Sequence, residues 1–252
     1  MKTDYQEVSI IILAVNQLEN LTKPCIESVL STSRETPAEL VLIDNGSTDG
    51  TSQYFHQLAQ RLGPEWVKVH SFPQNVGIAA GRIKGVELAT RDFIAFLDND
   101  IIATRPGWLS DLQKPLLKNP YLGVAGQTGY YVIVLNERWT IFFKCPTSQG
   151  ECDVVQGYCM MFRAQPYRKG FVALDPNYGK LWHDESDLCM QFKQIGYSTA
   201  YMDVGIHHKV NSTIRVSCGT EDELVRRYIE KTAYFSRKWF NYGLCKINQH
   251  HP

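Results

Sequence analysis

The stretch FIAFLDND, residues 93–100, decides the fold class because it joins an apolar run to two carboxylates. Phe93 to Leu97 has the length and composition of a buried strand, and Asp98 and Asp100 follow at its end. Two carboxylates at positions i and i+2 reach one point if the chain bends there, and a hard divalent cation prefers such oxygen ligands. An isolated acidic triplet is more often a solvated turn than a cation site, so the sequence around it is needed to decide between these two interpretations.

Three similar apolar runs precede this strand along the chain. Val8 to Val15 and Glu39 to Ile43 are continuous and rich in β-branched residues, as expected of parallel strands covered on both faces. Val67 to Ser71 is a third strand of this kind. The segments between the strands have helical spacing at Leu18–Ser31, Thr51–Arg61 and Ile78–Thr90. This alternation predicts an α/β fold with a mostly parallel, Rossmann-like sheet, right-handed crossovers and helices on both faces.

Polar residues gather just after the predicted strands. They are Asn16, Asp44, Asn45, Asn75, Asp98 and Asp100. Ligands of open α/β sheets bind at the carboxyl ends of the strands. The sequence therefore places its polar residues where a nucleotide would lie.

The second half of the chain has a mixed pattern that predicts a smaller mixed region. Gly129 to Lys144 alternates apolar and aromatic residues around a polar turn, which indicates a hairpin, and Val154 to Arg163 is a predicted strand. The other expected elements are helices at Trp108–Leu117, Asp187–Ile195 and Glu221–Phe240 and a strand at Thr199–Met202. For the last helix, packing against the domain is favoured over lying on a membrane surface.

The composition fits a single large domain with a sizeable core. The 252 residues are 44% hydrophobic and 12% aromatic, so disorder is not expected. Lys and Arg together number 26, as do Asp and Glu, and the net charge is zero. Because no global charge attracts nucleic acid or an anionic membrane, we expect no nucleic-acid partner, and any anion site must be local.

The cysteines and the N-terminus indicate a cytoplasmic protein. The seven cysteines are odd in number and form no close CxxC pair, so neither a zinc cluster nor a disulfide framework is expected. The apolar run from Val8 covers about eight residues, far short of the ~20 that cross a membrane. Acidic and polar residues precede it, unlike the start of a signal peptide.

These segments and several later blocks together resemble the family 2 glycosyltransferases. The matching blocks, in family order from Val8 to Lys209, are VSIIILAVNQLENLTKPCIESVL, ELVLIDNGSTDGT, NVGIAAGRIKGVELA, FIAFLDNDI, PGWL, GYCMMFR, WHDESDLCMQFKQIGY and IHHK. One block alone would be weak evidence, but all of them in sequence are highly specific. The resemblance implies a GT-A fold and a metal-dependent, inverting transfer of a sugar from a nucleotide-diphosphate donor.

The resemblance assigns donor-binding roles to four residues outside the acidic triplet. Asp44 resembles the residue that hydrogen-bonds the base of the donor, and Asn16 would border that base. Asn45, which follows Asp44 in the sequence, is also expected to bind the donor. Asn75 either forms only a turn with Gly77 or contacts the donor as well.

The same resemblance implies a divalent metal ion, Mn²⁺ or Mg²⁺, at the acidic triplet. Asp100 would be a direct ligand, and Asp98 would lie near both the ribose and the metal. His208 resembles the late histidine that completes the metal shell, with His207 as the alternative. A cation bridging two phosphates would offset the charge that grows on a leaving diphosphate.

WHDESDLC resembles the family block that carries the catalytic base. The acidic pair here is Asp184-Glu185, which reverses the commoner Glu-Asp order. By register Glu185 takes the position of the base, and Asp184 remains the alternative. An inverting transfer needs one carboxylate that takes a proton from the acceptor hydroxyl. Asp187 either shares in catalysis or caps the helix that is predicted to start there.

Three further residues have both a functional and a structural interpretation. Gly157 either lets the backbone approach the acceptor or marks a bulge. Trp182 either stacks on an acceptor sugar or belongs to the core. Arg82 is expected to be a charge on a helix surface in preference to a phosphate contact.

The expected organisation is one GT-A domain at residues 1–215, followed by a packed helix and tail at 216–252. Its nucleotide-binding half covers about residues 1–105 and its acceptor-binding half about 106–215. The expected donor is a nucleotide sugar, and UDP is the nucleotide typical of donors in this family. The acceptor is a carbohydrate, a lipid-linked oligosaccharide or a protein, as in polysaccharide or glycoconjugate synthesis. We expect a cytoplasmic location, either free or peripheral at the inner face of a membrane.

Two other function classes compete with the glycosyltransferase. A sugar nucleotidyltransferase shares the sheet and the metal, but it needs a Gly-rich, basic phosphate loop after the first strand. The corresponding stretch AVNQLENL has no Gly, Lys or Arg, which ranks that class lower. A catalytically inactive nucleotide-sugar-binding module is favoured only by the reversed order of Asp184 and Glu185. The oligomeric state is not predicted.

Overall fold

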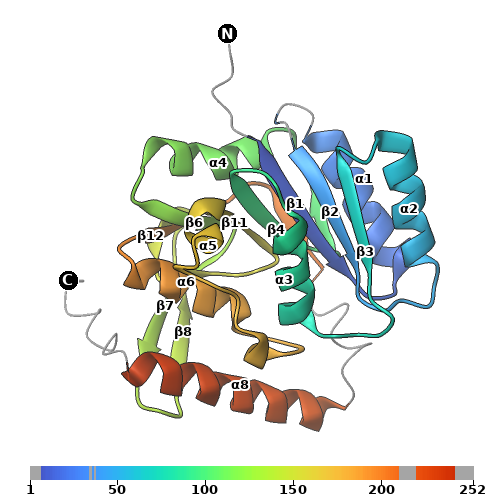
Figure 1. The fold of residues 1–252 in the computed structure, drawn as a ribbon. Coiled ribbons are helices and arrows are strands. Elements are labelled where there is room, and N and C mark those ends of the chain that lie inside the picture. Colours follow the sequence, from blue (N-terminus) through green and yellow to red (C-terminus); the bar gives the residue numbers. More distant parts are fainter. Residues whose placement is uncertain (1–6, 34–35, 37, 210–219, 242–252) are drawn as a thin grey trace.

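An eight-stranded sheet forms the centre of the computed structural model, which describes residues 7–33, 36, 38–209 and 220–241. The strand order is β3-β2-β1-β4-β11-β6-β12-β9. Helices cover the sheet, and the long helix α8, Glu221–Asn241, crosses the end of the molecule that holds β7 and β8 (Figure 1). The architecture is the α/β fold that the alternation of elements predicts.

The first four strands form the parallel part of the sheet. They are β1 Val8–Ala14, β2 Ala38–Asp44, β3 Val67–Ser71 and β4 Phe93–Asp98. The pairs β1·β2, β1·β4 and β2·β3 are all parallel, so the predicted strands and their pairing are confirmed. Because Ala14 pairs with Asp44 and Leu13 with Asp98, these strands end at one edge of the sheet.

The crossover helices lie where the spacing predicts them, with one correction. They are α1 Lys23–Thr32, α2 Thr51–Leu62 and α3 Ile78–Leu88. The single helix expected from residue 18 is wrong, because Leu18–Thr22 forms a π-helical turn, η1, before α1 begins. Pro24 lies in the first turn of α1, where its missing N–H costs nothing.

The second half of the chain extends the same sheet with mixed pairing. Strand β11, Cys159–Arg163, runs antiparallel to both β4 and β6, Leu122–Gly126. Strand β12, Ser198–Met202, is parallel to β6, and β9, Gln149–Cys152, closes the edge. The mixed region that the sequence predicts for the second half of the chain thus includes strands that continue the central sheet.

The strand expected over residues 154–163 is two strands in two sheets. Val154–Val155 is β10, which pairs with β7 in a small three-stranded sheet, whereas β11 belongs to the central sheet. Between them Gly157 turns its carbonyl toward Arg82, and the chain passes from one sheet to the other. An apolar run alone cannot reveal such a change of sheet.

The remaining elements follow β4 along the chain. The predicted hairpin is confirmed as β7, Gly129–Val134, paired with β8, Thr140–Lys144. A further small sheet joins β5 to β13. The other bounds are β5 Ile101–Ala103, α4 Trp108–Lys118, α5 Ala164–Arg168, η2 Pro176–Tyr178, α6 Asp184–Gln194 and β13 Ile206–His208.

Two apolar layers, one on each face of the sheet, form the core. On β1, Ile10 and Ile12 belong to the layer that includes side chains of α1, α2 and α4. Ile11 points to the other layer, which includes side chains of α3, α6 and α8. Successive strand residues face opposite sides, so a strand covered on both faces is apolar throughout.

Several expectations concern residues outside the described ones. They are the domain boundary at 215 and 216, Cys218, Cys245 and the tail from 242. The five cysteines that the structure describes are all buried and free. Among the described residues, no helix is both long and apolar enough to cross a membrane.

The close approach of α3 to β1 predicts the effect of adding one methyl group. A Cβ at Gly85 would lie 2.5 Å from Cγ2 of Ile11, a stiff side chain in the middle of the sheet. We expect Gly85→Ala to lower the free energy of unfolding, because overpacking costs about 1–3 kcal/mol and alanine's helix propensity returns only about 1. Lys84→Ala on the outer face of α3 should change it by less than about 0.5 kcal/mol. Urea unfolding measures both, and equal stability of the two variants would contradict the packing argument.

Candidate active site

Asp98, Asp100 and His208 form one group at the carboxyl edge of the sheet. One potential ligand atom of each lies within 4.8 Å of the other two. Asp98 ends β4, and Asp100 precedes β5. Pairing of β13 with β5 sets His208 opposite Ile101, which brings its Nε2 to 3.1 Å from Oδ1 of Asp100. The bend between the two carboxylates that the triplet requires is therefore present.

Strand alternation separates the two neighbouring histidines. His208 faces Asp100, whereas His207 is exposed on the other side of β13. Tyr158 stacks on the imidazole of His208 with a centroid distance of 4.3 Å and an interplanar angle of 12°. Of the two histidines considered from the sequence, the structure brings His208 and not His207 to the carboxylates.

The donor set of this group fits a hard divalent cation. Oδ1 of Asp100 is buried and has no well-aligned hydrogen bond from any described residue, which is a costly state for a carboxylate oxygen. Burial would lower the pKa of His208, but the carboxylates of Asp100 and Asp98 outweigh it and raise that pKa above its usual value. Carboxylate oxygens and one imidazole suit Mn²⁺ or Mg²⁺, and a cation would relieve the crowding of negative charge.

Arg82 is buried among carboxylates, so its expected place on the helix surface is wrong. Its side chain is 5% exposed and lies on the face of α3 that packs toward the sheet. Nη1 donates to Asp184 Oδ2 at 2.9 Å, and Nη2 donates to Asp98 Oδ1 at 3.1 Å. The ring of Phe96 lies 4.9 Å from the guanidinium carbon. The guanidinium thus joins Asp98, a member of the candidate metal-binding group, to the acidic pair.

A signal for this position was present in the sequence. Ala79 and Val86, three residues before and four after Arg82, are both buried. Helical periodicity puts residues at these spacings on one face. The apolar neighbours therefore predict a buried arginine, which requires carboxylate partners elsewhere in the chain.

The acidic pair opens helix α6, and its two members differ in exposure. Asp184 is 2% exposed and directly bonded to Arg82. Glu185 is 18% exposed, with Oε2 3.8 Å from Nη1 of the same arginine. Burial and the charge of Asp184 raise the pKa of Glu185 well above its usual range, although Arg82 opposes them. Glu185 is therefore the member that both reaches solvent and holds a proton more tightly than an ordinary glutamate.

Gly157 lies against Arg82. Its carbonyl oxygen accepts a hydrogen bond of 3.1 Å from Nη2. A Cβ at this position would lie 2.7 Å from both terminal nitrogens of the guanidinium. A glycine is needed here because the arginine occupies the space of a side chain.

Trp182 is half-buried next to the acidic pair and has an unusual backbone. Trp182 and His183 have φ values of 63° and 70°, a left-handed conformation that costs bulky residues energy. The indole meets the ring of Tyr228 edge-on at 5.4 Å, so α8 supports it. Trp182 is thus a neighbour of the acidic pair and a partner of α8 at once.

Asp44 and Asn16 organise the loop that follows β2. Asp44 Oδ1 accepts from the backbone N–H of Ser47 at 3.0 Å. Asn16 Oδ1 accepts from the N–H of Thr48 at 2.9 Å, and its own N–H donates to Ser47 Oγ at 2.8 Å. Both residues lie at the predicted edge of the sheet, and part of their bonding capacity fixes this loop.

Asn45 and Asn75 tie two neighbouring loops together. Asn45 Oδ1 accepts from the N–H of Val76 at 2.9 Å, and its Nδ2 donates to Oδ1 of Asn75 at 3.2 Å. Asn75 Oδ1 also accepts from the N–H of Gly77 at 2.9 Å. Asn45 is only 3% exposed. The geometry gives these two asparagines a supporting function in the loops at the carboxyl edge of the sheet.

Asp187 does not cap a helix, so that structural expectation is wrong. Helix α6 begins at Asp184, which puts Asp187 inside the first turns. Its buried carboxylate accepts from Lys238 at 2.8 Å and from the indole N–H of Trp239 at 2.9 Å. Sequence reasoning missed these partners because they follow about 50 residues later, on α8.

Comparison with known proteins names the family. Residues 9–171 match the model described as "Glycosyl transferase family 2". The chain belongs to this family. The family match covers β1 to β11 and includes Arg82, Asp98, Asp100 and Gly157. It ends before the acidic pair, His208 and α8.

Curated relatives are glycosyltransferases of several kinds. A glucosyl-dolichyl phosphate glucuronosyltransferase of Haloferax volcanii is 35% identical over 104 residues, which are 41% of this chain and 31% of that protein. A polypeptide N-acetylgalactosaminyltransferase 11 of Xenopus tropicalis is 27% identical over 192 residues, 69% of this chain and 31% of that protein. The chain thus spans about a third of the length of these two relatives.

Solved structures confirm the GT-A fold. GalNAc-T7 with UDP, GalNAc and Mn²⁺ superposes with a TM-score of 0.68 and 14% identity, covering 81% of this chain and 44% of the other. A mannosyltransferase of Pyrobaculum calidifontis with GDP-Man and Mn²⁺ gives 0.64 and 14%, covering 99% and 77%. At this identity the likeness concerns the fold alone.

The central position of Arg82 predicts a large effect on stability. We expect Arg82→Met to lower the free energy of unfolding by roughly 3–5 kcal/mol at pH 7, because it leaves buried carboxylates without their partner. The deficit should shrink toward pH 5, where those carboxylates take up protons more readily in the variant. Urea unfolding at the two pH values measures both effects, with Arg61→Met on α2 as the control. A deficit that is equal at both pH values would contradict the charge argument.

Proposed function

We propose that the protein transfers a sugar, with inversion, from a nucleotide-diphosphate sugar to a hydroxyl group of an acceptor. The observation that carries this proposal is the bridge through Arg82, which holds the metal-binding group and the acidic pair within the span of one guanidinium. A transfer reaction needs a donor pyrophosphate and an acceptor hydroxyl side by side. The Arg82 bridge holds a group suited to the pyrophosphate next to a group suited to the hydroxyl.

The donor side is supported by the group at the sheet edge. Asp100, Asp98 and His208 would hold Mn²⁺ or Mg²⁺, and Asp44 and Asn16 border the place of the base. A divalent cation there would stabilise the negative charge that develops on the leaving diphosphate. The two solved structures above were obtained with UDP and with GDP-Man, each together with Mn²⁺. We take a UDP-sugar as the first donor to test and a GDP-sugar as the second.

The acceptor side is supported by Glu185. A single displacement needs a carboxylate that removes the proton of the acceptor hydroxyl as the oxygen attacks the anomeric carbon. Glu185 is partly exposed and has a raised pKa, as suits a general base. Asp184 is buried and bonded to Arg82, so we assign it the task of orienting that arginine. Trp182, beside the pair, would stack on an acceptor sugar.

The proposed acceptor is a carbohydrate, a lipid-linked oligosaccharide or a protein side chain. Relatives named for a dolichyl phosphate acceptor and for a polypeptide acceptor both match this chain. A cytoplasmic enzyme in polysaccharide or glycoconjugate synthesis, either free or peripheral at the inner face of a membrane, agrees with these acceptors. The exposed side chains of Val225 and Ile229 on α8 favour the peripheral location.

The competing functions fit the site less well. A nucleotidyltransferase would hold its phosphates with a Gly-rich, basic loop after β1, and here that stretch forms the turn η1 without Gly, Lys or Arg. An inactive binding module gives no reason for a proton-holding carboxylate beside Arg82. Turnover by the wild-type protein separates this last possibility from an enzyme.

The metal-binding group gives the first functional prediction. We expect release of UDP from UDP-sugars, or of GDP from GDP-sugars, to require Mn²⁺ or Mg²⁺ and to fall at least 100-fold in Asp100→Ala. His208→Ala should weaken the response to the metal. His207→Ala, which changes the exposed neighbour, should leave turnover unchanged. If wild-type protein binds neither UDP nor GDP with either metal in calorimetry, the proposed function is wrong.

The acidic pair gives the second functional prediction. We expect Glu185→Gln to reduce kcat at least 100-fold while the affinity for UDP with Mn²⁺ stays within about threefold, because the change removes only the base. Since the base must be deprotonated, kcat/KM should rise with pH through a midpoint above the ~4.3 of an ordinary glutamate. The slope should disappear from the residual activity of Glu185→Gln. An unchanged kcat in this variant would exclude Glu185 as the base.

A further inference from the structure

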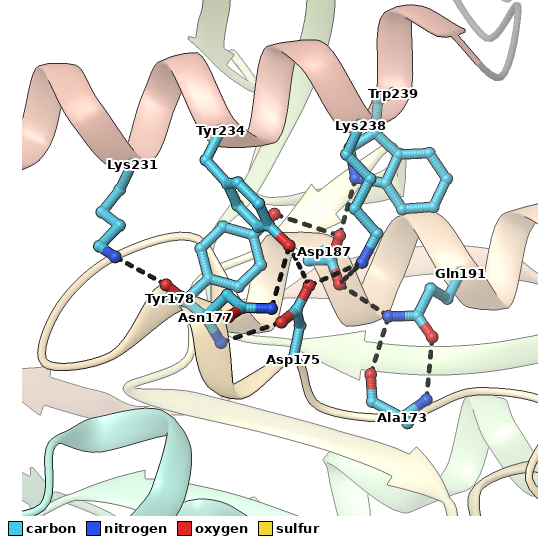
Figure 2. Close-up of polar contacts among 10 residues, drawn as sticks. All are labelled: Ala173, Asp175, Asn177, Tyr178, Asp187, Gln191, Lys231, Tyr234, Lys238 and Trp239. Carbon is cyan, nitrogen blue, oxygen red and sulfur yellow. Dashed lines mark hydrogen bonds and ion pairs between the residues drawn. The ribbon is translucent and has the colours of Figure 1, made fainter.

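Helix α8 lies beyond the residues that match the family model, yet it packs on the segment that carries the acidic pair. Figure 2 shows α8 lying over the loop with Ala173 and Asp175 and over α6, with side chains reaching from the helix to both. Two sets of its contacts lie on either side of the acidic pair, one on α6 and one on the residues just before α6. Each set constrains the backbone on one side of Asp184 and Glu185.

The first set of contacts centres on Asp187, which is completely buried. Lys238 Nζ lies 2.8 Å from Oδ2, and Trp239 Nε1 donates to Oδ1 at 2.9 Å (Figure 2). Tyr178 and Gln191 donate to the same carboxylate. Asp187 follows Glu185 by two residues on α6, so these bonds fix the position of the first turn of that helix.

A neighbouring carboxylate secures the same end of α8. Asp175 accepts from Tyr234 at 2.8 Å and pairs with Lys238 at 3.2 Å. Lys231 Nζ donates to the carbonyl of Asn177 at 2.6 Å. Two acidic side chains thus share one ammonium group, and the loop before η2 is bonded to α8.

The second set of contacts holds the two residues before the acidic pair. Nε2 of His183 lies 3.0 Å from Oγ1 of Thr232, and its ring lies 5.5 Å from that of Phe235. The imidazole also stacks on Phe142 of β8 at 5.0 Å, and the rings of Phe142 and Phe235 lie 5.5 Å apart. Trp182 meets Tyr228 of α8 edge-on. The imidazole is therefore held between α8 and the hairpin.

These contacts act on a strained piece of backbone. Trp182 and His183 are consecutive residues in the left-handed region, and non-glycine residues stay there only when the surroundings hold them. Asp184 and Glu185 follow directly as the first two residues of α6. A rotation about the backbone of either preceding residue would swing both carboxylates away from Arg82.

We propose that α8 positions the general base: Thr232 and Lys238 hold residues 182–187 so that Glu185 stays beside Asp184 and Arg82. This inference rests on the proposed function of Glu185. Thr232 and Lys238 bond to His183, Asp175 and Asp187, not to the acidic pair itself. They are positioning residues, whose loss should slow the proton transfer and leave the donor half intact.

The test replaces the hydroxyl of Thr232 in the full chain. We expect Thr232→Val to reduce kcat roughly tenfold, the effect of about one lost hydrogen bond on the transition state. The KM for the UDP- or GDP-sugar that wild type turns over, and the calorimetric affinity for its nucleoside diphosphate with Mn²⁺, should stay within about twofold. Thr232→Ser keeps the hydroxyl and should restore kcat to within about twofold of wild type.

The pH profile separates positioning from a general loss of stability. If Glu185 leaves its place beside Asp184 in Thr232→Val, the midpoint of kcat/KM should move down toward that of an ordinary glutamate. A variant that is merely less stable keeps the wild-type midpoint. Each protein is assayed well below its melting temperature, as checked by circular dichroism.

Lys238 provides an independent second variant. Lys238→Met removes the ammonium shared by Asp175 and Asp187, and we expect the same roughly tenfold loss of kcat with unchanged affinity for the nucleoside diphosphate. Arg237→Met removes a charge from the adjacent, exposed position and should leave kcat within about twofold. If Lys238→Met does not fold, the proposal is judged on Thr232→Val alone.

Specific outcomes overturn the inference. Folded Thr232→Val with wild-type kcat and midpoint would show that α8 contributes stability only. Equal losses of kcat and of nucleoside diphosphate affinity would show that α8 supports the whole site and not the base. Failure of the proposed function is a different result, because wild-type protein would then neither bind a nucleoside diphosphate nor release one.

Discussion

The candidate site depends on one buried cation with three carboxylate neighbours. Taking Arg82 and its partners out of water carries a large desolvation cost, which is offset only because the guanidinium presents its donors to Asp98, Asp184 and the carbonyl of Gly157 at once. A lysine has no planar group that could direct several donors to these separate acceptors. Two regions about 85 residues apart in the chain, β4 and the start of α6, therefore have a fixed separation, and that separation is the width of the site.

Much of the fold could be predicted, because parallel strands covered on both faces are apolar throughout and the first four are easily recognised. The carboxyl edge of the sheet also located Asp98 and Asp100 correctly. The later strands were harder: residues 154–163 look like one strand and cross between two sheets. Arg82 was expected on a helix surface and Asp187 at a helix cap, and the structure corrects both. The apolar neighbours of Arg82 indicate its burial, but the local sequence does not reveal the partners of either residue, which lie on α6 and α8.

At the carboxyl edge of the sheet, polar side chains use much of their hydrogen-bonding capacity to hold the loops of that edge. Asn45 and Asn75 bond to each other and to the backbone of the next loop, and Asn16 and Asp44 fix the loop after β2. Amide and carboxylate side chains suit this task because they satisfy backbone groups that no strand or helix pairs. A cluster of polar residues at strand ends thus identifies the edge of the sheet correctly but does not distinguish a ligand contact from a support.

The order of synthesis also determines when the sheet edge and the contacts that anchor the acidic pair can form. Strands β1 to β4 and their crossovers use only residues up to 98, whereas the partners of His183 and Asp187 are made last, at 232, 238 and 239. During synthesis the N-terminal part of a chain emerges from the ribosome first and folds first. The residues at the carboxyl edge of β1 to β4 are therefore made before the α8 residues that anchor the acidic pair, and a ribosome that stalls near residue 220 has not yet made those anchors.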